Sequence, residues 1–166
     1  MADLKLAYGT ATDLTITLAS LATDANLLTG RESATIDNTS LLVLDYLVSG
    51  KITSGTSPTA AKSIEVWAIG SWDGTNWPDT MDGTDSGETF TSADIKASVC
   101  KYIAAMATSA TSNVAYHFGP VSLAAAFGGV LPPKIVLFVT HSTAVALNAT
   151  AGNHQIRLQP VFQTVN

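Results

Sequence analysis

The chain has 166 residues, of which 46% are hydrophobic and only 13% are charged, with 8 basic against 13 acidic residues. Its length predicts a single domain that buries about two-thirds of the surface of the unfolded chain. Lys and Arg form no cluster, which argues against a nucleic-acid partner. The single cysteine, Cys100, excludes an intrachain disulfide framework and zinc-finger spacing, and we expect it to be a small buried hydrophobe.

The first residues, MADLKLAYGTATD, contain two acids and no sustained apolar core, so they do not have the pattern of a signal peptide. No stretch approaches the roughly 20 apolar residues of a membrane span. We therefore expect a protein that is made in the cytoplasm and has no membrane partner. Residues 1–9 precede the first clear strand and are predicted to form an N-terminal arm. Residues 10–166 are predicted to form a single β-sandwich domain.

The first half of the chain is rich in strand patterns. Leu and Ile alternate with Thr over residues 14–18, which predicts a strand, and residues 33–37 predict a short one. Residues 41–48 (LLVLDYLV) are apolar at successive positions, as in a central strand. Residues 49–61 are dense in Gly, Ser, Thr and Pro, which predicts a turn or an exposed loop.

Residues 62–71 (KSIEVWAIGS) show the period-2 pattern of a strand in a packed sheet. Ile64, Val66 and Ala68 are predicted to face one side, and Glu65, Trp67 and Ile69 the other. This strand runs into WDGTNWPDTMDGTDSGE, a loop without a single basic residue. Loops of this length inside a compact domain are usually functional or partly disordered.

Residues 92–107 (SADIKASVCKYIAAMA) carry two competing patterns. Ser92 with Asp94 could cap a helix, and Ile95, Val99 and Tyr102 lie near helical spacing. The residues from position 99 to 106 also alternate as in a strand. We favour a strand from about Lys101.

The second half of the chain continues the strand pattern. Strands are predicted at residues 114–118, at 134–140 (KIVLFVT, the clearest buried strand), at 145–147 and at 155–162. Pro160 predicts an edge or a bulge in the last of these. Residues 120–127 predict one or two helical turns, which Gly128 and Gly129 would end. About eight strands with one or two short helices predict an all-β fold, and the long connections favour a jelly-roll-like β-sandwich.

The acidic loop, residues 73–88, is the first candidate for a site. Asp79, Asp82, Asp85 and Glu88 recur every three residues, and carboxylates so dense could gather Ca²⁺. Their spacing does not match the EF-hand loop, so we favour a solvated acidic loop over a metal site. Trp72 and Trp77 could stack on sugar rings, but such residues more often hold a loop against its own sheet or a neighbouring subunit.

The remaining chemistry of the sequence is sparse. His117, His141 and His154 lack the i,i+4 helical spacing of a zinc site, and we expect satisfied surface histidines. No GxSxG nucleophile motif or glycine-rich phosphate loop is present. We therefore predict no catalytic, cofactor-binding or metal-binding residues and no cofactor, and we expect that the protein is not an enzyme.

Three segments carry a resemblance to a known class of protein. They are ADLKLAYGTATDLTITLASLA at the start, KSIEVWAIGSWDGTNWPD in the middle and HFGPVSLAAAFGGVLPPKIVLFVTHSTAVALNATAGNHQIRLQPV at the end. In the general character of their sequences and in their order along the chain, they resemble virion structural proteins of tailed bacteriophages, in particular jelly-roll head-decoration (cement) proteins. The resemblance spans most of the chain and contains no functional motif.

This resemblance implies a protein that binds the outer surface of an assembled head and locks the capsid lattice against the pressure of the packaged DNA. Its partners would be the major capsid protein and copies of itself, as a dimer or trimer. It would be made in the host cytoplasm and end on the capsid surface of the virion. A tail or neck component of the virion and a carbohydrate-binding β-sandwich module are the alternative functions.

Overall fold

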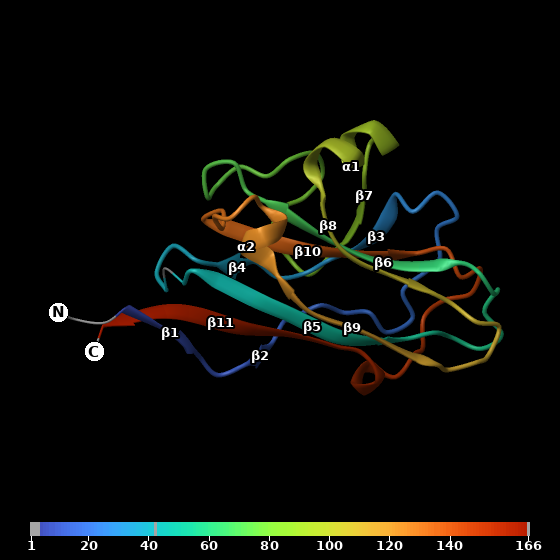
Figure 1. Cartoon of the computed structure of the whole chain (residues 1–166). Helices are drawn as coiled ribbons and strands as arrows, with labels where there is room; N and C mark the ends of the chain where they lie inside the picture. Colours follow the sequence, from blue (N-terminus) through green and yellow to red (C-terminus); the bar gives the residue numbers. More distant parts are fainter. Residues whose placement is uncertain (1–3, 42, 166) are drawn as a thin grey trace.

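The computed structural model describes residues 4–41 and 43–165, which form two antiparallel sheets packed face to face (Figure 1). The first sheet contains β1 (Leu4–Tyr8), β2 (Thr12–Asp13), β5 (Asp45–Thr53), β9 (Ala115–Ser122) and β11 (Gln155–Val165). The second contains β3 (Thr29–Glu32), β4 (Ile36–Asp37), β6 (Ser63–Gly70), β7 (Gly87–Thr89), β8 (Lys101–Ala107) and β10 (Lys134–His141). Two short α-helices, α1 (Ala93–Val99) and α2 (Leu123–Ala126), and one 3-10 turn, η1 (Ala151–Asn153), complete the described chain.

The strand order identifies the topology. The first sheet runs β1-β11-β5-β9, and the second runs β3-β10-β6-β8 with β7 added outside β3. When these eight main strands are numbered along the chain, the orders become 1-8-3-6 and 2-7-4-5. This interleaving of early and late strands is the order of a jelly roll. The predicted all-β jelly-roll sandwich is therefore confirmed.

The second sheet is covered on both faces, which explains its apolar strands. One face packs against the first sheet in a core that includes Ile64, Val66 and Leu137. The other face packs against a smaller cluster that includes Ile69 and Phe138. Strand β6 therefore contributes alternate side chains to two cores, as its period-2 pattern predicted.

The segment after β7 forms a helix and then a strand, so each of the two patterns in its sequence is realised in part. The Ser92 hydroxyl accepts a hydrogen bond from the Ile95 amide at 3.2 Å and caps α1, which ends at Val99. Strand β8 begins at Lys101, as we favoured. Lys96 then fastens α1 to the sheet, because its ammonium group lies 3.2 Å from a Glu65 carboxylate oxygen.

Helix α2 begins at Leu123 and not at the predicted residue 120, because residues 120–122 still belong to β9, but its stop matches the prediction. The Ser122 hydroxyl accepts from the Ala125 amide at 2.9 Å, and α2 extends to Ala126. Gly128 and Gly129 follow with φ of +82° and +108°. Glycine adopts these positive φ values without a side-chain clash, so it can end the helix here.

Strand β5 was misplaced by the sequence pattern. Residues 41–48 were predicted as a strand and 49–61 as a turn or loop, whereas β5 begins at Asp45 and ends at Thr53. Gly50 lies inside the strand at a bulge, where a Cβ atom would stand 2.7 Å from the Gln155 carbonyl oxygen. The glycine therefore permits close packing with its neighbours and does not mark a turn.

Two other predicted strands, residues 14–18 and 145–147, belong to no strand of the structure. Over residues 14–18 the backbone bonds to several elements: Leu14 N donates to Ile156 O at 2.8 Å, and Thr15 O accepts from Ala34 N at 2.9 Å. The alternating pattern correctly predicted that Leu18 is buried. It could not reveal that this segment lacks a partner strand among the described residues. Residues 145–147 likewise lie outside the strands, although Leu147 is buried.

The N-terminal segment, predicted as an arm over residues 1–9, forms strand β1 over residues 4–8, and residues 1–3 lie outside the described chain. Strand β1 pairs along its length with the end of β11. Strand β11 is interior, so the edge predicted from Pro160 is wrong. The proline lies opposite Gly9, at the end of β1, where the amide that it lacks interrupts little of the ladder.

Candidate functional site

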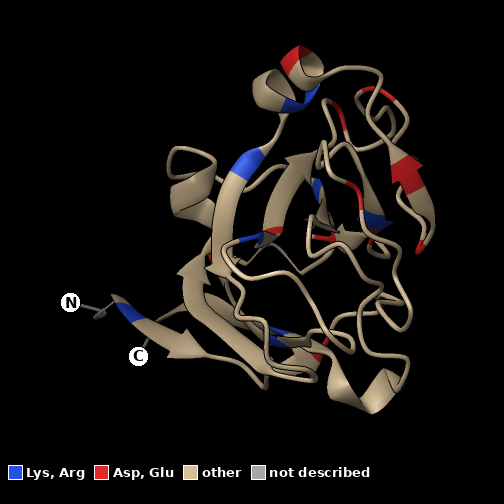
Figure 2. Ribbon diagram, turned by 90° about the vertical axis from the view of Figure 1, so that its right-hand side faces the viewer, with Lys and Arg blue, Asp and Glu red and all other residues tan. Residues whose placement is uncertain are grey.

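The acidic loop, residues 73–88, is held down at several points on the outer side of the second sheet. Its apolar side chains Trp77 and Met81 pack into the smaller core, which also contains Phe90 and Phe138. The rings of Phe90 and Phe138 meet edge to face with centroids 5.1 Å apart. The loop is therefore an ordered part of the fold, and its acids gather beside β7 (Figure 2).

Asp73 shapes the first turn of the loop. Its carboxylate accepts hydrogen bonds from the Asn76 amide at 2.7 Å and the Thr75 amide at 2.8 Å. These bonds, the one from the Asn76 backbone foremost, lower the pKa of Asp73, because they favour the charged carboxylate. Asp73 therefore stabilises its own turn, and its hydrogen bonds give no indication of a binding site.

Asp79 and Asp85 are also engaged inside the chain. Asp79 accepts hydrogen bonds from the backbone amide and the hydroxyl of Thr91. Asp85 lies 2.6 Å from Arg31 and accepts from the Thr17 amide at 2.9 Å. Burial raises the pKa of Asp85, but its bonds from Arg31 and Thr17 outweigh that effect, and the pKa is lowered.

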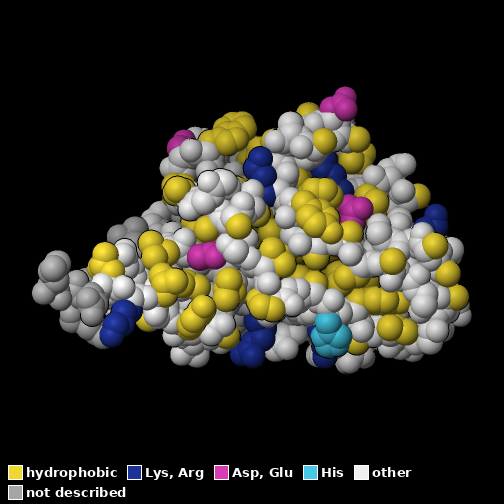
Figure 3. Space-filling model, viewed as in Figure 1, with side chains coloured by type: hydrophobic (Ala, Val, Ile, Leu, Met, Phe, Trp, Pro, Cys, Tyr) yellow, Lys and Arg dark blue, Asp and Glu magenta, His cyan; other side chains and the backbone are white. Residues whose placement is uncertain are grey.

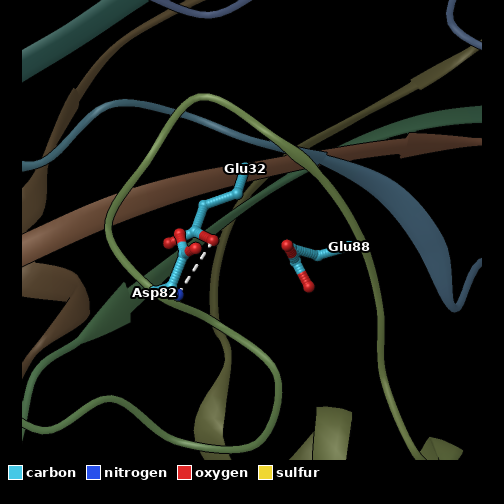
Figure 4. Close-up of side chains that lie close together, drawn as sticks. All are labelled: Glu32, Asp82 and Glu88. Carbon is cyan, nitrogen blue, oxygen red and sulfur yellow. Dashed lines mark hydrogen bonds between the residues drawn. The ribbon is translucent and has the colours of Figure 1, made fainter.

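Three carboxylates do converge: Glu32, Asp82 and Glu88 each place an oxygen within 4.8 Å of the others (Figure 4). Glu32 comes from β3 and is fully buried, Asp82 comes from the loop, and Glu88 comes from β7. The four acids predicted as a possible Ca²⁺ cluster thus divide. Asp82 and Glu88 meet around Glu32, whereas Asp79 and Asp85 have the separate partners described above.

Glu32 ties the acidic loop to β3. Its two carboxylate oxygens accept hydrogen bonds from the Gly83 amide at 2.8 Å and the Asp82 amide at 3.2 Å. Gly83 has a φ of +84°, and a Cβ atom there would stand 3.0 Å from the Trp77 ring nitrogen. Glycine is thus required both for the turn and for the close contact with the ring.

The environment of Glu32 favours its protonated form. Burial raises the pKa of Glu32 from 4.5 to about 7, against the lowering effect of the two backbone amides. The negative charges of Asp82 and Glu88 add to the increase. The cluster can therefore hold a proton near neutral pH.

The same three carboxylates are the residues that could hold a cation. Ca²⁺ takes about six to eight oxygen ligands. Three carboxylates reach six ligands only if every one binds through both oxygens, and both oxygens of Glu32 already accept hydrogen bonds from backbone amides. The geometry therefore fits an internal anchor of the loop better than a cation site. The sequence missed Glu32, although its alternation with Gly30 in β3 places both on the buried side.

The two tryptophans differ sharply in exposure. Trp72 is 72% exposed, whereas Trp77 packs into the smaller core. Trp77 therefore holds the loop against its own sheet, which is the favoured interpretation of the two. Only Trp72 offers its ring to a ligand, beside a hollow lined by Pro132 and Phe127.

Two histidines and the cysteine fill structural positions, whereas His117 is exposed on β9, as expected. His141 is fully buried and bonds to Thr143 and to the Leu21 carbonyl, so the expected surface position is wrong for this residue. His154 lies 2.8 Å from the Asn148 carbonyl oxygen. Cys100 is buried as predicted, and burial raises its pKa to about 12, so the thiol is a poor nucleophile.

A scan of protein-family models and searches of curated proteins and of solved structures found no match to this chain. Over residues 4–41 and 43–165, the helices are all too short to cross a membrane.

Proposed function

We propose that this chain is a structural protein of a bacteriophage virion that binds the outer surface of the head and stabilises the capsid lattice. The resemblance of three sequence segments and the jelly-roll sandwich support this function. The observation that carries it is a concentration of exposed hydrophobic side chains at one end of the molecule, where a large partner surface could cover them.

Eight large hydrophobic side chains are exposed in the described chain. Six of them belong to β1, to the β4–β5 connection or to the loop after α2, segments at the end from which β1 and the end of β11 project (Figure 1), and we name these six the apolar end. They are Leu4, Leu6, Tyr8, Leu41, Leu44 and Val130, with exposed fractions of 45% to 77%. Figure 3 shows hydrophobic side chains on the surface of this end, as well as along the rest of the face in view.

Contacts between segments bring the apolar end together. The Leu44 amide donates to the Val161 carbonyl at 2.9 Å, and Val161 lies opposite Tyr8 in the ladder of β1 and β11. Leu44 and Val130 line one shallow hollow, between the β4–β5 connection and the loop after α2. Segments far apart in the sequence thus present apolar side chains on the same end.

The low charge of the chain fits such a partner. Only 13% of its residues are charged, so its surface offers weak electrostatic protection against association. Burying one Leu or Val side chain stabilises a contact by about 1.5–3 kcal/mol. A contact made by a few such side chains, repeated at many positions of the capsid, would stabilise the whole shell.

The test is binding to heads that lack this protein. Purified protein is added to such heads and its occupancy is measured by quantitative gel analysis and cryo-electron microscopy. Leu44→Ser combined with Val130→Ser should lower the affinity at least about tenfold, because both apolar contacts are lost. Tyr102→Ser is the matched control, because Tyr102 is 57% exposed but lies on β8, outside the apolar end.

Equal occupancy of the double variant and the control would contradict docking through the apolar end. Copies confined to the tail or neck of the virion would replace the proposal with that alternative. The carbohydrate-binding alternative has one exposed tryptophan, Trp72, to offer a sugar ring. Binding to a glycan array that Trp72→Ala abolishes would favour it over capsid binding.

A further inference from the structure

Strand β1 lies at a free edge of the first sheet. In the described part of the chain it pairs only with β11. Strand β5 accompanies β11 only as far as the pair of Asp45 and Val161. Beyond that pair, β1 and the end of β11 form a two-stranded ribbon that projects from the sandwich (Figure 1). A two-stranded ribbon is marginally stable in water, so this one gains from a further strand.

The ladder shows which backbone groups of β1 are free. Gly9 donates to the Pro160 carbonyl at 2.8 Å, and residue pairs in an antiparallel ladder alternate between bonded and non-bonded. Ala7 and Lys5 therefore direct their amides and carbonyls toward β11. Leu4, Leu6 and Tyr8 direct theirs away from it, toward the free edge.

The side chains of those three residues are also uncovered. Leu4 is 64% exposed, Leu6 is 65% and Tyr8 is 64%. Because they alternate along one strand, they share one face of the ribbon. Free hydrogen-bonding groups and exposed apolar side chains thus belong to the same residues. Long apolar edges of this kind are where strands of other chains add.

We propose that β1 pairs antiparallel with β1 of a second copy of this chain, about a two-fold axis at Leu6. In this register Leu6 faces Leu6 of the other copy, and Leu4 faces its Tyr8. Each of these three pairs exchanges two backbone hydrogen bonds, because all three residues have groups that point to the free edge. The result is a continuous sheet with an uninterrupted apolar stripe.

For two copies of β1, charge selects this register. Lys5 is the one charged residue of β1, and the pairing about Leu6 places it opposite Ala7 of the other copy. Sliding the strands by two residues, so that the axis passes through Lys5, would set two ammonium groups opposite each other and lose hydrogen bonds. Antiparallel pairing also places the two sandwiches at opposite ends of the joined ribbons, where they do not collide.

This pairing does not rest on a role in a virion and is tested on the purified protein alone. Sedimentation equilibrium of the full chain should show a monomer–dimer equilibrium. Leu6→Lys should raise the dimer dissociation constant at least about tenfold, because it places two like charges at the centre of the interface. Gln163→Lys, which adds the same charge one strand away on β11, should leave the constant near its wild-type value.

Disulfide trapping tests the register. Leu6→Cys should form a disulfide-linked dimer on mild oxidation, because paired Cα atoms in a bonded pair lie about 5.5 Å apart, within disulfide range. Leu4→Cys and Tyr8→Cys should link when mixed but not separately, since each residue would lie roughly 14 Å from its own copy. The native Cys100 is buried and does not interfere.

Circular dichroism and the urea midpoint check that each variant folds, which exposed side chains should permit. A wild-type protein that stays monomeric at all concentrations would overturn the proposal. So would efficient linking of Leu4→Cys to itself, which requires a different register.

Discussion

The edge of the second sheet at β7 and the edge of the first sheet at β1 are built in opposite ways. Strand β7 has three residues, and Glu88 places a charge in its middle. Strand β1 has five residues, and three of them expose large apolar side chains. A short charged edge resists the addition of another strand, whereas a longer apolar edge invites it.

The two edges also differ in what lies behind them. Next to β7, Phe90 is buried against Phe138, and Glu32 holds the acidic loop through two backbone amides. Behind β1, the end of β11 is the only strand among the residues that the structure describes. Charge density therefore does not predict which region meets a partner. Carboxylates of the acidic loop accept hydrogen bonds from within the chain. The sparsely charged ribbon instead leaves backbone amides and carbonyls of β1 without a partner strand.

The largest expected effect on the free energy of unfolding comes from removing a buried aromatic ring next to β7. Phe90→Ala should lower the free energy of unfolding by about 3–5 kcal/mol, because it leaves a cavity beside Phe138. Leu6→Ala on β1 should change it by less than about 0.5 kcal/mol when measured on dilute monomer. Urea denaturation followed by tryptophan fluorescence measures both. Similar losses for the two variants would contradict the contrast between the edges.

An intermediate effect is expected from the pH dependence of Glu32. Its raised pKa means that the folded state binds a proton more tightly than the unfolded chain. This contribution to stability is therefore complete below pH 4.5 and is lost as the pH rises through about 7. Its size is at most about 3 kcal/mol over that window.

His141 and His154 act in the opposite sense. Burial lowers the pKa of each, so acid favours the unfolded chain as the pH falls below 6.5. Glu32→Gln should therefore make stability rise more steeply with pH between 4.5 and 7 than in the wild type. A constant loss of about 1 kcal/mol should accompany it, because one backbone amide loses its acceptor.

Urea midpoints at a series of pH values test this difference. Asp94→Asn, which removes an exposed carboxylate from α1, should retain the wild-type profile. Parallel pH profiles for Glu32→Gln and the wild type would show that Glu32 does not carry a raised pKa.

The smallest effect is expected at Trp72, which begins the acidic loop but is 72% exposed. Trp72→Ala should change the free energy of unfolding by less than about 0.5 kcal/mol. Trp77→Ala, five residues later, should cost more than Trp72→Ala, because Trp77 is partly buried and packs against the smaller core. Equal costs for the two tryptophans would mean that the loop is held by something other than its buried side chains.

Sequence patterns predicted the fold well where one physical cause dominates. The apolar run of β10 and the alternation of β6 followed from burial, and the Ser92 cap and Gly128–Gly129 stop followed from backbone chemistry. They failed at β5, where Gly50 serves a close contact between strands. They also failed at β1, where pairing with the other end of the chain makes the strand.

The candidate site was predicted only in part for a related reason. The density of acids in the loop was visible, but the residue that anchors it, Glu32, lies about fifty positions earlier in β3. Nothing in the local sequence relates these positions. Their meeting depends on β3 and β7 being neighbours in the second sheet.

By itself, the sequence determined that this protein is an all-β sandwich, because period-2 burial and turn chemistry act between neighbours along the chain, whereas the pairing of distant strands gave the jelly-roll order. Only the tertiary structure decided which acids meet and which edge stays open. Hydrogen bonds and charges act over a few ångströms between strands that lie far apart in sequence. Thus Asp85 is neutralised by Arg31, while Leu4, Leu6 and Tyr8 remain uncovered.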